Sequence, residues 1–208
     1  KDMRSQDYSK IKDLYRPGHA DLTYDLKYGF RDYRGGGRSS GRETLARVMA
    51  GAIAQKLLKT GGKTEIIGHT VQVGDIITKN FDKNFIEKNE LRCADTKIAP
   101  KMIQLIEKLR FKEGDSIGAV IEIIVKNPPK GLGEPVFDKL DAKLAQAMMS
   151  IGSVKGVEIG SGFNAAKLKG SENNDQMQKN GKIKFLSNHS GGTLGGISTG
   201  EDIVIRLA

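Results

Sequence analysis

The chain has 208 residues, of which 38% are hydrophobic, so it can bury a core as one domain or two small ones. Its formal net charge of +9 predicts attraction to phosphates, carboxylates or nucleic acid. Cys93 is the single cysteine, and no apolar run approaches the roughly 20 residues of a membrane helix. These features exclude an internal disulfide, a cysteine-based zinc site and a membrane-spanning segment, and they predict a reducing, cytoplasmic setting.

The first predicted elements are a polar lead-in over residues 1–15 and a helix that follows a glycine-rich stretch. Ser40-Gly41-Arg42-Glu43 has the Ser-x-x-Glu form of a capping box, which predicts a helix start. Gly61-Gly62 predicts its end. Between them, apolar residues recur at three-and-four spacing and form one face: Leu45, Val48, Met49, Ala52, Ile53, Leu57 and Leu58.

The rest of the chain alternates strand and helix patterns without a repeat of fixed period. β-branched or apolar runs predict strands at residues 64–77, 116–125, 154–159 and 202–207, and amphipathic spacing predicts helices at 100–111 and 136–151. Residues 171–182 are polar and are predicted to form an exposed, flexible loop. The alternation favours a mixed α/β layered structure, with residues 1–208 as a single domain.

A basic, glycine-rich segment is the leading candidate for anion binding. It carries six arginines together with Gly35-Gly36-Gly37 and Ser39-Ser40; the arginines are Arg16, Arg31, Arg34, Arg38, Arg42 and Arg47. Glycines let a backbone approach a ligand, free amides at a helix start bind anions, and guanidinium groups grip phosphate bidentately. The alternative is a solvated basic loop before an ordinary helix cap, with nearby aspartates holding individual arginines.

Two of the three histidines lie in notable surroundings. His19 follows the rigid Pro17-Gly18 turn beside Arg16, which suits a general acid for a leaving phosphate, although a histidine there can also be purely structural. His189 lies in a segment rich in glycine and hydroxyls, residues 187–200, which either moulds around a flat ring or phosphate or is a hairpin without a ligand. His69 lies in a strand pattern and is predicted to be packed.

Two nucleotide-binding motifs fail on their context. Gly62-Lys63-Thr64 resembles the end of a P-loop, but the first glycine would fall at Leu57 and the motif follows a helix. This argues against a phosphate-binding kinase. Gly160-Ser161-Gly162-Phe163-Asn164-Ala165 resembles a dinucleotide fingerprint, but Gly170 leaves little room for the required helix.

Several motifs, taken in order, resemble chorismate synthase from Arg16 to the final strand. They are Arg16-Pro-Gly-His-Ala-Asp, Lys27-Tyr-Gly, Arg31-Asp-Tyr-Arg-Gly-Gly-Gly-Arg-Ser-Ser-Gly-Arg-Glu-Thr, Gly131-Leu-Gly-Glu-Pro-Val-Phe-Asp, Val154-Lys-Gly-Val-Glu-Ile-Gly, Leu168-Lys-Gly-Ser-Glu and Ser187-Asn-His-Ser-Gly-Gly. The resemblance implies an α+β fold, a layered β-α-β sandwich with helices packed between antiparallel sheets.

The resemblance also implies a reaction, its cofactor and its partners. The family eliminates phosphate from 5-enolpyruvylshikimate 3-phosphate to give chorismate, in the shikimate pathway to aromatic amino acids. It requires reduced FMN without net oxidation, with NADPH as a candidate reductant of the flavin. The implied partners are a phosphorylated small molecule and further copies of the chain in a homotetramer, with no nucleic acid and no membrane.

Residue roles carry over by motif. The resemblance implies His19 as the acid that assists phosphate departure, and Arg16 and Arg42 as groups that grip the anionic substrate. It implies flavin contacts by the remaining matched positions: Arg38, Ser39, Ser40, Gly152, Ser153 and Gly195. At Gly152-Ser153 the family more often has Asn-Ala or Pro-Ala, so we expect that contact to use backbone atoms.

Some of the family's functional segments have no counterpart in this sequence. The family begins with a segment that contains a Ser-His-Gly motif, and it continues past the last strand with a Lys-Pro-Thr segment and a later Arg and Asp. Because the chain begins at Lys1 rather than Met, we expect a central fragment of a longer protein. For the 208 residues alone, we expect weak or absent FMN binding and no turnover.

A basic nucleic-acid-binding module is the alternative function. The charge of +9 motivates it, and Tyr24, Tyr28, Phe30 and Tyr33 lie among the arginines. However, aromatic residues make up only 6% of the chain and tryptophan is absent, whereas surfaces that stack single-stranded bases interleave aromatics with basic residues. The sequence therefore favours a small-molecule anion.

Overall fold

The computed structural model describes residues 5–34, 37–38 and 40–208. The chain forms two compact units, Lys1–Ala54 and Gln55–Ala208, and each is described by itself. The prediction of a single domain over residues 1–208 stays a prediction.

The first unit contains short helical elements around a polar centre. They are η1 (Ser5–Ile11), α1 (Asp21–Tyr28), η2 (Gly41–Glu43) and the beginning of α2 (Thr44–Gly61), which continues into the second unit. The sequence analysis missed α1, which ends where Gly29 adopts a left-handed conformation with φ of 74°. Pro17-Gly18 precedes it as a turn.

The predicted helix after the glycine-rich stretch is confirmed as α2. One 3₁₀ turn, η2, leads into it, and Ser40 Oγ accepts a hydrogen bond from the Arg42 amide at 3.3 Å. Glu43 instead pairs with Arg47 one helical turn later, at 3.2 Å. The apolar face predicted on this helix is exposed: Leu45, Val48, Met49, Ile53 and Leu57 each keep more than 60% of their surface accessible.

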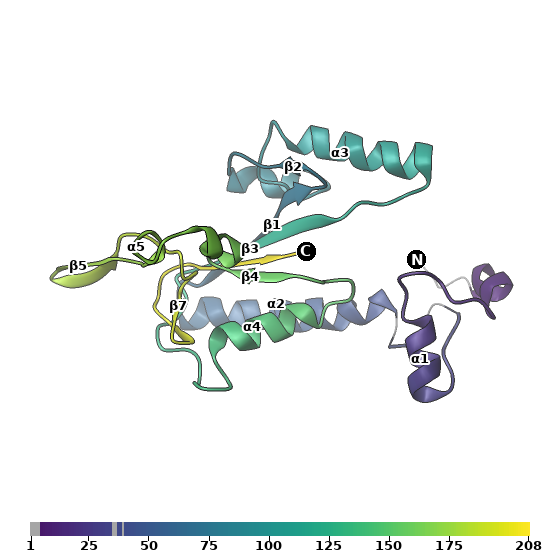
Figure 1. Cartoon of the computed structure of the whole chain (residues 1–208), viewed down its shortest axis with the longest axis horizontal. Helices are drawn as coiled ribbons and strands as arrows, with labels where there is room; N and C mark the ends of the chain where they lie inside the picture. Colours follow the sequence, from purple (N-terminus) through teal and green to yellow (C-terminus); the bar gives the residue numbers. More distant parts are fainter. Residues whose placement is uncertain (1–4, 35–36, 39) are drawn as a thin grey trace. The chain divides into compact units, whose positions relative to one another are not determined.

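The second unit is built on a five-stranded antiparallel sheet in the order β2-β1-β3-β9-β4 (Figure 1). The strands are β1 (Glu65–Val73), β2 (Ile76–Ile77), β3 (Ala119–Lys126), β4 (Val157–Ile159) and β9 (Ile203–Leu207). β3 and β9 are rich in Ile and Val, which pack well on a pleated surface. The single strand predicted over residues 64–77 is wrong in one respect, because a turn at Gly74-Asp75 divides it into β1 and β2.

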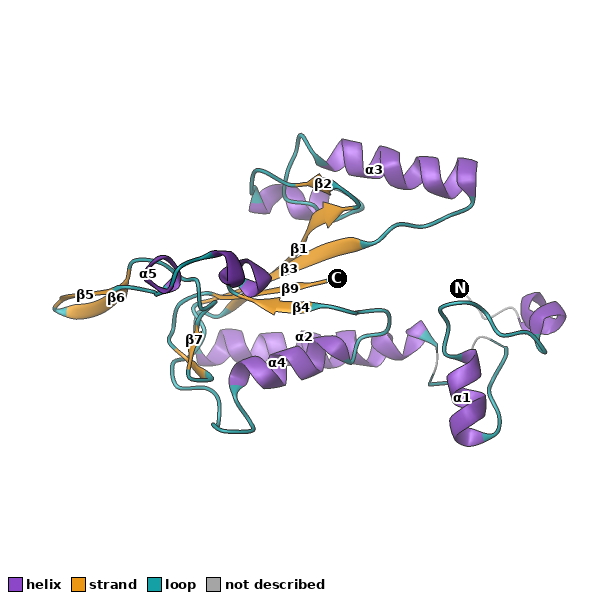
Figure 2. Cartoon of the chain, in the orientation of Figure 1, coloured by secondary structure: helices purple, strands orange, loops and turns teal. Residues whose placement is uncertain are grey.

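A small core fills the edge of the sheet beside β1. Val73 packs with Cys93 and with Ala99 and Met102 of α3 (Ala99–Lys108), and each of these residues is at most 1% exposed. A second cluster joins Ile67 of β1 to Ile86 and Ala94. Ile86 lies in η3 (Lys83–Lys88), and the π-helical turn η4 (Leu109–Glu113) extends α3. Figure 2 shows α3 at one end of the second unit.

Asp95 joins the segments of this core. Its side chain is fully buried and accepts hydrogen bonds from the amides of Lys79, Asn80, Lys97 and Ile98 at 2.8 to 3.1 Å. Burial alone would raise the pKa of Asp95, but these backbone hydrogen bonds outweigh it and lower the pKa to about 2. The carboxylate therefore fixes the start of α3 against the loop that follows β2.

The other elements of the second unit lie toward β4. The helix α4 (Leu140–Met149) packs beside β4 and is shorter than predicted, because residues 136–139 precede it as loop. Beyond β4 come η5 (Gly162–Lys167) and α5 (Gly170–Asn173). Two hairpins follow, β5 (Met177–Asn180) with β6 (Lys182–Phe185) and β7 (Thr193–Leu194) with β8 (Ile197–Ser198). Residues 171–182, expected as a loop, thus contain the end of α5 and the strand β5.

The prediction of mixed helices and antiparallel sheet is confirmed. Among the described residues, none of the helices combines the length and apolar character needed to cross a bilayer.

Candidate functional site

A buried carboxylate organises the first unit. Asp21 is 4% exposed and accepts hydrogen bonds from Arg16 Nε at 2.8 Å, Arg16 Nη2 at 2.9 Å and the Arg16 amide at 3.1 Å. His19 Nδ1 lies 3.1 Å from Asp21 Oδ1 and 3.3 Å from Arg16 Nη2. The hydrogen bond from Arg16 holds the pKa of Asp21 well below its usual range. The structure therefore brings together Arg16 and His19, as the sequence predicted, and the residue that holds Arg16 is Asp21, one of the aspartates expected to hold individual arginines.

The orientation of His19 leaves one ring nitrogen for a ligand. Because Arg16 Nη2 can only donate, His19 Nδ1 accepts its hydrogen bond, and we assign the proton of the neutral ring to Nε2. The side chain is 32% exposed, so a substrate can reach it. The Nε2 proton is then the one that the ring can give to a ligand, as a general acid requires.

Arg31 serves the structure of the first unit. Its side chain is 8% exposed, donates to Asp25 at 2.9 Å and to the carbonyl oxygens of Lys12 and Leu14 at 2.6 and 2.9 Å, and stacks over Tyr15 at 4.8 Å. These contacts tie the lead-in segment to α1. The sequence-based expectation that aspartates hold individual arginines is confirmed here and at Arg34, which donates to Asp32 at 3.1 Å.

The residues near α2 that were predicted to bind anions differ in their surroundings. Ser40 caps η2, and Arg42 is exposed in the turn that follows it. The predicted contact at Ser39 lies outside the described residues. The arrangement places a hydroxyl, an arginine and the amino end of an 18-residue helix in sequence, and helix starts favour bound anions.

Aromatic side chains form a hollow beside Arg38. It has a volume of about 380 Å³ and is lined by Tyr24, Tyr28 and Phe30 together with Arg31 and Arg38. The Tyr24 and Tyr28 rings are 5.3 Å apart and tilted by 59°. Aromatic walls suit a planar ring, and a guanidinium at the rim suits an attached anion. This hollow fits the prediction that Arg38 contacts a flavin.

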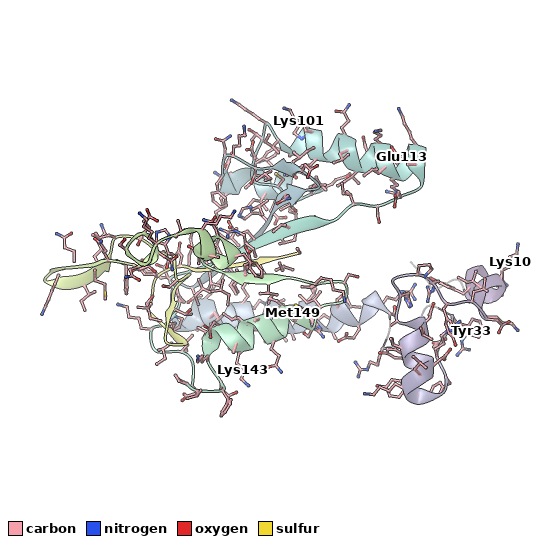
Figure 3. The ribbon with its side chains drawn as sticks, in the orientation of Figure 1. Lys10, Tyr33, Lys101, Glu113, Lys143 and Met149 are labelled. Carbon is pink, nitrogen blue, oxygen red and sulfur yellow. The ribbon has the colours of Figure 1, made fainter. Side chains whose placement is uncertain are left out.

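The flavin positions predicted in the second unit lie at opposite ends of α4. The Leu140 amide at the start of α4 donates to the Gly196 carbonyl at 2.8 Å, which places Gly195 near that end. Gly152-Ser153 follows the other end, and Ser153 has a left-handed φ of 72°. Because α4 has 10 residues, the two positions are roughly 15 Å apart along its axis. Figure 3 labels Lys143 near the first end and Met149 at the second.

Gly195 lies in an open turn at the tip of the β7-β8 hairpin. Gly195 and Gly196 have φ values of 59° and 83°, which suit a two-residue hairpin turn. A side chain at Gly195 would meet no atom within 4 Å. Gly195 is therefore accessible to a ligand, as its prediction as a flavin contact requires, whereas Gly196 is buried against Lys139.

Asp175 anchors the loop that leads to this hairpin. Its Oδ1 accepts hydrogen bonds from Ser187 Oγ at 2.7 Å and from the His189 amide at 2.6 Å, and its Oδ2 accepts one from the Ser190 amide at 2.8 Å. His189 Nδ1 lies 3.1 Å from Ser161 Oγ. The sequence analysis noted Asp175 only as part of a polar stretch.

The rejected dinucleotide motif has a structural role. Gly160 and Gly191 touch backbone to backbone, and a side chain at either position would overlap main-chain atoms at the other. Residues 162–167 form a 3₁₀ helix, so the motif does not open the α-helix that would hold a pyrophosphate, and α5 begins only at Gly170 and has four residues. The reasoning that rejected the motif is confirmed.

A row of charged residues crosses one face of the sheet and was not predicted. His69, Glu122, Arg206 and Glu158 are successive partners in the register of four strands. Arg206 Nε donates to Glu122 at 2.8 Å, and His69 Nε2 lies 3.3 Å from Glu122 without hydrogen-bond alignment. His69 and Arg206 together hold the pKa of Glu122 below its usual value. The prediction that His69 is packed is confirmed, because its side chain is 4% exposed.

No group of three or more histidine, cysteine, aspartate or glutamate side chains within the described part of the chain is arranged to hold a metal ion.

Comparison with known proteins gives one consistent family. A family model described as chorismate synthase matches residues 1–208. The chorismate synthases of Chloroflexus aggregans (strain MD-66 / DSM 9485) and Chloroflexus aurantiacus (strain ATCC 29366 / DSM 635 / J-10-fl) are 55% and 54% identical to it, over 100% of this chain and 57% of each relative. A solved structure described as "Crystal Structure of Chorismate Synthase" matches with a TM-score of 0.82 and 36% identity, over 90% of this chain and 61% of that one.

Proposed function

Because the chain belongs to the chorismate synthase family, we propose that its protein eliminates phosphate from 5-enolpyruvylshikimate 3-phosphate to give chorismate. This is a carbon-oxygen lyase reaction of aromatic amino-acid biosynthesis. The chain spans 57% of the length of the curated relatives it matches, so the proposal concerns a protein of the relatives' full length that contains it. The nucleic-acid alternative gains no support from these relatives.

The observation that carries the proposal is the Arg16-His19-Asp21 cluster. The Asp21 carboxylate binds Arg16, and Arg16 Nη2 donates to His19 Nδ1, which leaves the Nε2 proton of the ring to be given to the departing phosphate. The same carboxylate occupies Nε and Nη2 of Arg16, so the Nη1 hydrogens remain to bind an anionic group of the substrate. Asp21 thus fixes the proton donor and one anion-binding group relative to each other.

Substrate and cofactor anions have further candidate partners in the first unit. We assign Arg42, which follows the Ser40 cap, to the substrate's charged groups. Arg38 and Ser40 are assigned to the flavin, and Ser39 stays a prediction from the family motif.

Reduced FMN is the proposed cofactor. When bound, it supplies electron density that eases phosphate departure. The hollow beside Arg38 supports this proposal, because Tyr24, Tyr28 and Phe30 line it together with the guanidinium groups of Arg31 and Arg38 and the carboxylate of Asp32. The Gly195 turn and Gly152-Ser153 are proposed as flavin contacts through backbone atoms. NADPH as the flavin reductant, a homotetramer and a cytoplasmic location stay predictions.

Anaerobic titration with reduced FMN, with and without the phosphorylated substrate, tests the function. We expect a protein of the relatives' full length that carries this chain to bind reduced FMN and release phosphate. The 208 residues alone are expected to bind FMN weakly and to release no phosphate. Failure of the full-length protein to release phosphate with saturating reduced FMN would refute the proposed function. Phosphate release by the 208 residues alone would refute the expectation that they are inactive without the rest of the protein.

A further inference from the structure

The Asp175 carboxylate lies outside every motif that the proposed function uses, yet it binds three donors of the loop before β7. Asp175 follows α5 and precedes β5, and the loop that it holds begins directly after β6, so its contacts lie at the base of the β5-β6 hairpin. Ser187 Oγ and the amides of His189 and Ser190 converge on its two oxygens at 2.6 to 2.8 Å. A surface carboxylate seldom collects three such donors, because one partner or water usually suffices.

The carboxylate is held in its charged form. Burial acts to raise the pKa of Asp175, but the hydrogen bonds from Ser187, Ser190 and His189 lower it to about 2. These bonds are charge-assisted, and such bonds are roughly twice as strong as neutral ones.

The contacts continue from the Asp175 loop to the β7-β8 hairpin. Asn188 lies among the three donor residues, and its Oδ1 accepts from the Gly192 amide at 2.9 Å while its Nδ2 donates to the Asp202 carbonyl at 2.7 Å. Gly192 precedes β7 directly, and its carbonyl accepts from the Thr199 amide after β8 at 3.0 Å. Asp175 is thereby connected to both ends of the hairpin that carries Gly195.

The loop has little freedom on its other side. Gly160 and Gly191 are in backbone contact, and the Ser161 amide donates to the His189 carbonyl at 2.7 Å. Asp175 on one side and Gly160-Ser161 on the other therefore both hold residues 187–192. A loop held in this way presents its hairpin before a ligand arrives, which reduces the entropy cost of binding.

We propose that Asp175 is a positioning residue for the flavin: it fixes residues 187–192 so that the Gly195-Gly196 turn is preformed for cofactor binding. This rests on the proposed function, in which that turn contacts FMN. Asp175 itself contacts only the loop, so its effect on the flavin passes through the hairpin.

The test compares Asp175→Asn with Asp202→Asn in a protein of the relatives' full length that carries this chain. Asp202 is a matched control, because its carboxylate is 39% exposed and accepts from Lys126 rather than from the loop. Hydrogen exchange reads the amides of residues 189–197, and anaerobic fluorescence titration reads the dissociation constant of reduced FMN.

We expect Asp175→Asn to speed exchange of these amides at least tenfold and to weaken FMN binding about tenfold, with Asp202→Asn changing neither. Ser187→Ala removes only one of the three donors and serves if Asp175→Asn does not fold. It is expected to shift both readouts in the same direction by about threefold.

Faster exchange with unchanged FMN affinity would overturn the positioning role and leave Asp175 a structural residue. Unchanged exchange in both Asp175→Asn and Ser187→Ala would overturn the anchor itself. If the unsubstituted protein binds no reduced FMN, the proposed function is refuted. If it binds reduced FMN and Asp175→Asn binds it equally well, only the positioning role of Asp175 is refuted.

Discussion

Replacement of Asp95 by asparagine is expected to destabilise the second unit by about 3 kcal/mol. The charged side chain is fully buried, and each of its two oxygens accepts from two backbone amides. Asparagine keeps one acceptor oxygen and places an NH₂ group against the other two amides. Each buried amide that loses its acceptor costs about 1–3 kcal/mol, so two such losses cost about 2–6 kcal/mol, and partial relaxation places the expected value in the lower half of that range.

The pKa of Asp95 adds an independent check on this value. The pKa falls from 3.8 to about 2 on folding, and at 1.36 kcal/mol per pKa unit this corresponds to about 2 kcal/mol of stability. Because the folded pKa is the lower one, this contribution is complete above pH 4 and is lost as the pH falls toward 2. The asparagine variant lacks it, so the difference in stability between the two proteins should narrow by about 2 kcal/mol across that range.

Urea unfolding of both proteins at pH 6 and at steps down to pH 2 measures these quantities. Asp75→Asn is the control, because Asp75 is exposed in the turn between β1 and β2 and its substitution should cost less than 0.5 kcal/mol, as surface changes usually do (about ±0.5 kcal/mol). A loss below 1 kcal/mol at pH 6 for Asp95→Asn, or a difference that does not narrow in acid, would contradict the role assigned to the carboxylate.

Three further predictions concern the site and the loop. In a full-length protein, His19→Ala should lower kcat for phosphate release by a factor of about 10²–10⁴ while the affinity for FMN changes little. An equal loss of kcat and of FMN affinity would argue against His19 as the proton donor. Arg38→Ala should weaken reduced FMN binding about tenfold in fluorescence titration, as expected for one charge-assisted hydrogen bond; unchanged affinity would remove Arg38 from the flavin site. Gly160→Ala should cost about 3 kcal/mol in urea unfolding because its side chain would overlap the His189 carbonyl, whereas Gly68→Ala meets no atom within 4 Å and should cost less than 1 kcal/mol.

The sequence predicted the long regular elements well because their signals are local. The spacing of apolar residues from Leu45 to Leu58 identified α2, and the Ile- and Val-rich runs identified β3 and β9. The division of residues 64–77 into two strands depended on one turn at Gly74-Asp75. The α1 helix was missed because it is short and follows Pro17-Gly18, which suggested only a turn.

The sequence predicted which residues belong to the candidate site more fully than it predicted which of them contact one another. The pairing of Arg16 with His19 and the holding of arginines by nearby aspartates were anticipated from their spacing, but Asp175 and Glu122 gain their roles from contacts that the sequence does not reveal. Asp175 meets residues 12 to 15 positions away, and Glu122 meets Arg206 across 84 positions. Such pairings follow from strand register and loop closure, which no local pattern encodes.

The helix α4 separates two proposed cofactor contacts, so its length sets the distance and the relative direction of those contacts. Inserting one residue into it would advance one end by about 1.5 Å and turn it by about 100° relative to the other, while a whole added turn would keep the direction but lengthen the gap by about 5.4 Å. Insertions and deletions should therefore be tolerated in the β5-β6 hairpin, which projects from the unit (Figure 1), and selected against within residues 140–149.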